Sequence, residues 1–162
     1  MNSVNKSVLR VKKFFKQLEN YNSNKIIVYT DKINALAQAN LSDKRFNKIS
    51  NIDGQLFVVK PNIRVSSFPY TGGIKEFENS ISLTDDPLIA NIKNNGGIIV
   101  GSTNMDEAAF GGDTSSSFYG RCINPINKKL SVGGSSGGSS AAISSGIVKY
   151  SIGTDTMGSV RI

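Results

Sequence analysis

The chain has 162 residues, a length typical of one domain that can bury a core. Hydrophobic residues make up 38% and charged residues 19%, which is typical of a globular protein, and no apolar run reaches the about 18 residues of a membrane-spanning helix. The single cysteine, Cys122, excludes an internal disulfide and a multi-cysteine zinc site. The absence of histidine excludes Ser-His-Asp and Cys-His hydrolases and His-ligated metals.

The net charge of +7 comes entirely from the N-terminal third. Residues 1–60 carry eleven Lys and Arg against four Asp and Glu, whereas residues 61–162 carry eight of each. Any anionic partner is therefore expected to bind the N-terminal third.

The first eighteen residues predict a basic amphipathic helix. No acid precedes Glu19, and apolar residues recur at helical spacing: Val4, Val8, Val11, Phe15 and Leu18. Three interpretations stay open, namely a mitochondrial presequence, a patch for RNA phosphates, and a surface helix with a solvated basic face. We assign residues 1–50 to a basic helical region and candidate targeting segment.

Short apolar strands and helices alternate along the rest of the chain. We predict strands over 26–29, 56–59, 98–100 and 147–152, and helices over 31–40, over 87–93 and around 141–143. Pro61 holds the preceding Lys60 extended, so this lysine ends a buried strand. The alternation predicts an α/β fold.

Residues 131–162 are half glycine and serine, a composition also typical of a flexible linker. The small and apolar residues Ala141, Ala142 and Ile143 suit a packed helix, and residues 147–152 suit a strand. We therefore predict that this segment is folded.

The spacing of the candidate residues argues against several other kinds of functional site. The loop at 133–138 is composed like an anion cradle, but it lacks the P-loop and dinucleotide-binding patterns. The acidic pairs at 85–86 and 106–107 are adjacent in sequence, and nothing else indicates that they converge. A metal site would need all-oxygen ligands and no calcium-loop spacing exists, so we predict no metal.

Serine chemistry with a lysine base remains. Ser135 and Ser159 lie in glycine-flanked loops 24 residues apart, and glycine lets backbone N–H groups approach an oxyanion. In an apolar setting Lys60 loses its charge more easily, because burial disfavours the ammonium form. A neutral Lys60 can then accept a proton.

The motifs Gly-Gly-Ser-Ser-Gly-Gly-Ser at 133–139 and Gly-Thr-Asp-Thr-Met-Gly-Ser-Val-Arg at 153–161 resemble the signature of the amidase signature family. The resemblance covers about residues 54–162. It implies an α/β fold with a mixed β-sheet covered by helices, of which residues 51–162 are the N-terminal part of one amidase domain. It also implies three catalytic residues: Lys60, Ser135 after a cis peptide bond, and the nucleophile Ser159.

The resemblance implies a proton relay. Lys60 takes a proton from Ser135 while Ser135 takes one from Ser159, which attacks an amide carbonyl. The expected oxyanion hole consists of backbone N–H groups: Thr156, Met157, Gly158 and Ser159.

Within the family, Thr-Asn-Met-Asp-Glu at 103–107 and Asn-Pro at 124–125 are similar to the A subunit, which is the amidase, of glutamyl-tRNA(Gln) amidotransferases. This similarity implies glutamine hydrolysis without a cofactor in the amidase itself. The B subunit of such an enzyme would use ATP and Mg²⁺ to activate glutamate on tRNA(Gln) and would receive the ammonia. Two alternatives stay open: a stand-alone amidase on another carboxamide, and a catalytically silent scaffold.

The chain departs from the family pattern at three positions. Met157 stands where glycine is usual and would be strained if φ is positive there, Pro61 replaces a common aspartate, and Ser102 replaces a lysine. The region before Gly54 is also short and poorly matched, which leads us to expect a divergent member of the family. Together with the acid-poor N-terminal helix, this favours the mitochondrial matrix and the fungal type of complex, which adds a small third subunit. The cytoplasm is the alternative.

Family members continue for several hundred residues beyond the nucleophile. We therefore expect this chain to be an N-terminal fragment or a truncated product that is inactive alone. The residues that read the substrate would lie beyond Ile162.

Overall fold

A computed structural model of the chain describes residues 6–162, so Val4 of the predicted first helix lies outside the described part. The elements are α1 (Lys6–Glu19), β1 (Ile27–Thr30), α2 (Lys32–Lys44), β2 (Leu56–Val59), α3 (Pro87–Asn94), β3 (Ile98–Thr103), α4 (Gly137–Ser144) and β4 (Tyr150–Ile152). Three short 3₁₀ helices lie in the connections: Asn22–Asn24, Lys75–Phe77 and Glu107–Ala109. None of the described helices is long and apolar enough to cross a membrane.

The sheet places three strand ends at one edge. Its order is β1-β3-β2-β4, in which β2 is parallel to both β3 and β4 and β1 is antiparallel to β3. Val59, the last residue of β2, pairs with Ser102 on β3 and with Ile152 on β4. The carboxyl ends of β2, β3 and β4 therefore share one edge, where ligand sites of α/β sheets usually lie.

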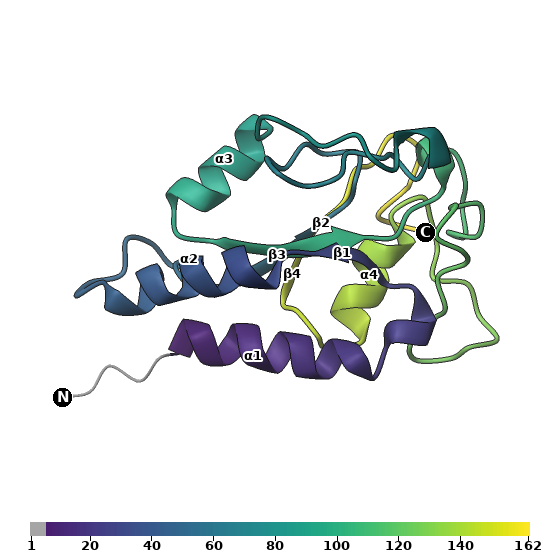
Figure 1. Cartoon of the computed structure of the whole chain (residues 1–162). Helices are drawn as coiled ribbons and strands as arrows, with labels where there is room; N and C mark the ends of the chain where they lie inside the picture. The colour runs from purple at the N-terminus through teal and green to yellow at the C-terminus, as the bar shows by residue number, and fades with distance from the viewer. Residues whose placement is uncertain (1–5) are drawn as a thin grey trace.

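Helices cover both faces of the sheet (Figure 1), with α3 on one side and α1 and α4 on the other. Alternate residues of β2 point to the two faces: Leu56 and Val58 pack with α1, α2 and α4, whereas Phe57 and Val59 pack with α3. This two-sided burial explains why β2 is apolar throughout instead of alternating with polar residues.

Local sequence signals explain most helix limits. Asp31 caps α2, because its carboxylate accepts the Asn34 N–H at 2.9 Å, and Pro87 is the first residue of α3. Helix α2 continues four residues past the predicted Asn40, and Asp43 in this extension accepts the N–H groups of Ser7 and Val8 at the start of α1.

Two predicted strands have different limits in the structure. The strand predicted over 147–152 was too long, because Ile147 and Val148 are buried in the core beside α1 and α4 while only Tyr150–Ile152 pairs with β2. The strand predicted over 98–100 was too short. Its polar extension to Thr103 is stabilised by pairing with β1 on one side and with β2 on the other.

Helix α1 is part of the core, which bears on the interpretations of its basic sequence. Val8, Val11 and Phe14 are buried, and they share one cluster with α2, α4 and the sheet. Residues 6–50 and 51–162 therefore form one packed unit, and the predicted boundary at residue 50 separates no independent core. This packing favours a structural helix with a solvated basic face.

Replacement of Ile89 tests the packing of α3 on the sheet. Ile89 is fully buried, so Ile89→Ala should lower the free energy of unfolding by about 2–5 kcal/mol. Ile33 is 85% exposed on α2, so Ile33→Ala serves as the control and should change stability by about 0.5 kcal/mol or less. Urea titration of both variants measures the difference, and equal losses would contradict this packing.

Candidate active site

Lys60 lies directly after β2, as the sequence predicts for a lysine at a strand end. Its N–H donates to the Ile152 carbonyl at 2.9 Å, which continues the pairing of β2 with β4. The whole residue is buried. The sheet therefore fixes the backbone of Lys60. Its long side chain extends beyond the strand and places the amine among residues of other loops.

The Lys60 amine ends among three hydroxyl groups. Nζ donates to Ser135 Oγ at 2.7 Å, to Ser136 Oγ at 2.8 Å and to Thr154 Oγ1 at 2.9 Å. The predicted apolar setting is therefore wrong: the side chain is buried, but its charged end is surrounded by polar groups. Burial still lowers the pKa of Lys60 to about 8, against the opposing effect of the negative charges on Asp106 and Asp155.

Ser135 lies between Lys60 and Ser159. It is buried, and the peptide bond between Gly134 and Ser135 is cis, as the family resemblance implies. Its Oγ donates to Ser159 Oγ at 3.1 Å, and its carbonyl accepts the Asp106 N–H at 3.2 Å. Because a hydroxyl can turn to donate or accept, the three groups form a continuous path for a proton.

Ser159 lies half-buried on the loop after β4. Its carbonyl accepts the Ser136 N–H at 3.1 Å, which ties this loop to the start of α4. The Asp155 carboxylate stabilises this loop, because it accepts the Gly158 N–H at 2.8 Å and pairs with Arg161 at 2.9 Å. The Arg161 guanidinium and the Gly158 N–H hold the pKa of Asp155 well below its usual range.

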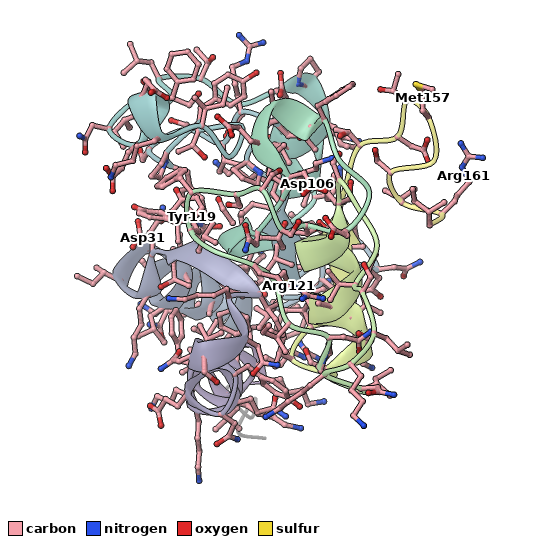
Figure 2. All side chains as sticks on the ribbon, turned by 90° about the vertical axis from the view of Figure 1, so that its right-hand side faces the viewer. Asp31, Asp106, Tyr119, Arg121, Met157 and Arg161 are labelled. Carbon is pink, nitrogen blue, oxygen red and sulfur yellow. The ribbon has the colours of Figure 1, made fainter. Side chains whose placement is uncertain are left out.

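The four expected oxyanion donors do not all fit that role in this structure. The Gly158 N–H is occupied by Asp155, which leaves the N–H groups of Thr156, Met157 and Ser159 from the predicted set. The predicted strain at Met157 is also absent, because the positive φ of 112° falls on Gly158. Met157 is 90% exposed and extends with Arg161 from the protruding loop (Figure 2).

Four residues near the amine were not predicted as part of the site. Ser136 and Thr154 accept from Lys60, Asn62 donates to Thr154 Oγ1 at 3.0 Å, and Asp106 holds the Ser135 carbonyl. Ser136 and Thr154 lie inside the two recognised motifs, so their place beside Ser135 and Ser159 was a usable signal. Asn62 and Asp106 follow strand ends, and only the parallel pairing of the strands brings them to this edge.

Cys122, the single cysteine, lies buried in the hydrophobic core. Burial raises the pKa of the Cys122 thiol to about 12, which keeps the thiol protonated and unreactive. Among residues 6–162, no three His, Cys, Asp or Glu side chains gather closely enough to hold a metal ion.

Comparison with known proteins covers nearly the whole chain. The family described as Amidase matches residues 10–162, which includes most of α1, so the expectation that the resemblance begins near residue 54 was too narrow. The glutamyl-tRNA(Gln) amidotransferase A subunit of Endomicrobium trichonymphae is 39% identical over 160 residues, and that of Staphylococcus aureus strain Newman is 36% identical over 135 residues. These matches cover 96% and 81% of this chain but only 33% and 28% of the relatives.

Solved structures agree with these relatives. One similar structure is a protein from a vestigial complex that reveals the evolutionary origins of an s-triazine catabolic enzyme. It superposes with a TM-score of 0.90 at 28% identity, and the match covers 96% of this chain and 35% of that one. The A subunit of the Thermotoga maritima glutamyl-tRNA(Gln) amidotransferase gives 0.70 at 28% identity, covering 93% and 32%. The chain spans about a third of the length of its curated relatives. The predicted resemblance and α/β fold are confirmed, and the chain belongs to the amidase family.

Proposed function

We propose that the chain is the N-terminal part of the amidase subunit of a glutamyl-tRNA(Gln) amidotransferase, and that Lys60, Ser135 and Ser159 hydrolyse glutamine. One observation carries the chemistry: an unbroken hydrogen-bonded path joins Lys60 Nζ to Ser135 Oγ at 2.7 Å and Ser135 Oγ to Ser159 Oγ at 3.1 Å. The 36–39% identity to two amidotransferase A subunits supports the choice of substrate.

In the proposed first step, Ser159 Oγ attacks the carboxamide carbon of glutamine. The Ser159 proton passes to Ser135 Oγ as the Ser135 proton passes to Lys60 Nζ, so that Lys60 becomes an ammonium ion. The same path then returns a proton to the leaving nitrogen, and ammonia departs from an acyl-enzyme on Ser159. Water, deprotonated through the same relay, releases glutamate and restores the hydroxyl.

Backbone groups of the last loop would stabilise the oxyanion. The N–H groups of Thr156, Met157 and Ser159 remain available, while Asp155 fixes the loop by holding the N–H of Gly158. Stabilisation of this kind usually contributes more than any other effect to the acceleration of acyl transfer. A methionine can serve here because only its N–H is used, which removes one reason to expect a silent scaffold.

The ammonia would pass to the B subunit of the complex, which would activate glutamate on tRNA(Gln) with ATP and Mg²⁺. We propose no cofactor for the amidase subunit itself. The small third subunit and the mitochondrial matrix stay sequence predictions. The side chains that select glutamine are proposed to lie in the part of the relatives that this chain does not span.

Ammonia release tests the nucleophile. We expect Ser159→Ala to abolish glutamine hydrolysis by the longest reading frame containing this chain, expressed with the B subunit, because the proposed nucleophile is the hydroxyl that Ser135 Oγ contacts at 3.1 Å. Ser80→Ala, at an exposed serine outside the site, is the control. Release that rises with misacylated tRNA and ATP would support the amidotransferase, release independent of both would favour a stand-alone amidase, and no release by the wild type would favour the scaffold.

The pH dependence of hydrolysis tests the base. A protonated Lys60 cannot accept a proton, so activity should rise about tenfold per pH unit below pH 8 and level off above it. The rise itself follows from the need for a neutral amine, and burial moves its midpoint down from the ordinary lysine pKa of 10.5 to about 8. Values of kcat/KM between pH 6 and 10 measure the midpoint. A rate that falls across pH 8 would contradict a lysine base.

Thr154→Val tests the hydroxyl cluster around the amine. The change keeps the side-chain shape but removes an acceptor that lies 2.9 Å from Lys60 Nζ. We expect kcat to fall about tenfold or more with little change in KM, because the ammonium ion formed on Lys60 in the first step loses an acceptor and Nζ is held less firmly. Thr84→Val at an exposed threonine is the matched control, and equal kcat values in the two variants would contradict the role of Thr154.

A further inference from the structure

Asp106 is a buried carboxylate beside the catalytic residues, with no part in the relay described above. It follows β3 at the sheet edge where Lys60 follows β2 and Thr154 follows β4. The residue is fully buried, and Figure 2 shows it well separated from Met157 and Arg161 on the protruding loop. A buried carboxylate is costly unless its oxygens are paired, so its partners indicate what it does.

Every hydrogen bond to the Asp106 carboxylate comes from an uncharged donor. Oδ2 accepts the Thr114 N–H at 2.9 Å, while Oδ1 accepts the Ser115 N–H at 3.0 Å and both Ser116 Oγ and N–H, at 3.0 and 3.3 Å. In the described part of the chain, no Lys or Arg nitrogen lies within 4.0 Å of it. The donors satisfy the oxygens without cancelling the negative charge.

The backbone around Asp106 is shaped to admit this carboxylate next to Ser135. A Cβ at Gly111 or at Gly134 would collide with the Asp106 side chain, so both positions need glycine for close approach. The Asp106 N–H also holds the Ser135 carbonyl at 3.2 Å. Asp106 therefore connects residues 114–116 to the residue whose hydroxyl lies between Lys60 and Ser159.

The negative charges of Asp106 and Asp155 both raise the pKa of Lys60, and the two carboxylates differ in their surroundings. Asp155, on the loop after β4, is solvent-exposed and ion-paired with Arg161, which screens it. Asp106, after β3, is buried and has no cation partner among residues 6–162, so its field is less screened. The remaining groups at Nζ are the hydroxyls of Ser135, Ser136 and Thr154.

We propose that Asp106 is a positioning residue of the relay, whose N–H holds Ser135 and whose uncancelled carboxylate charge keeps a proton available on Lys60 for the leaving ammonia. The inference rests on the proposed function, in which Lys60 must both accept and return a proton. Desolvation alone would leave Lys60 a weak proton acceptor at neutral pH. A buried anion nearby raises its proton affinity and sets the relay close to the working pH.

The test follows the protonation of Lys60 through the rate at which Ser159 reacts, and it needs no amide substrate. The rate constant for phosphonylation of Ser159 by a fluorophosphonate is followed against pH in the longest reading frame with its partner. Asp106→Asn keeps one acceptor oxygen but removes the negative charge. The pH at which the rate constant reaches half of its maximum should therefore fall by about one unit. Glu107→Gln, at the exposed neighbouring carboxylate, should leave the midpoint unchanged.

A structural role alone would lower the rate of Asp106→Asn at every pH and leave its midpoint in place, which would overturn the proposal. If wild-type Ser159 is not labelled, the proposed function fails, and titration of the Lys60 ¹³Cε resonance in both proteins then decides the role of Asp106. The wild type gives a second test that needs no variant. A midpoint that is stable between about 0.05 and 0.5 M salt supports a buried charge, whereas a falling midpoint would assign the effect to the exposed Asp155 and overturn the proposal.

Discussion

The structure depends on placing one amine out of water at the end of a strand. A buried ammonium is costly unless each of its protons has an acceptor, and Lys60 Nζ has three: Ser135, Ser136 and Thr154. These acceptors come from two loops that precede α4 and follow β4. Asp106 and Asp155 hold these two loops in place. The hydroxyls and carboxylates at this edge of the sheet therefore together stabilise the ammonium form of Lys60.

The sheet supplies the geometry that this arrangement needs. Strands β2, β3 and β4 are parallel, so Lys60, Asp106 and Thr154 follow strand ends at the same edge. Helices on both faces bury the strands and keep these ends in register. Helix α1 takes part in that packing through Val8, Val11 and Phe14, which gives its apolar face a structural role independent of its basic one.

The sequence predicted the fold and the three-residue relay because both depend on local patterns. Apolar runs at 56–59 and 98–100 identified buried strands, and the glycine-serine motifs carried the family resemblance. Other features depend on contacts between distant segments and leave no local pattern. The Asp106–Ser135 contact, the third acceptor on Thr154 and the use of the Gly158 N–H by Asp155 belong to this group. The excess length predicted for the last strand has the same origin, since Ile147 and Val148 are apolar for core packing.

In the proposed reaction Ser159 is the nucleophile, and Ser135 only passes a proton. The two hydroxyls are 3.1 Å apart, and either could in principle carry an acyl group. The direct measurement is to quench the protein in acid during turnover of a slowly hydrolysed glutamine analogue and map the acylated peptide by mass spectrometry. We predict the acyl group on Ser159, in the peptide that includes residues 153–161. An acyl group on Ser135 would contradict the assignment.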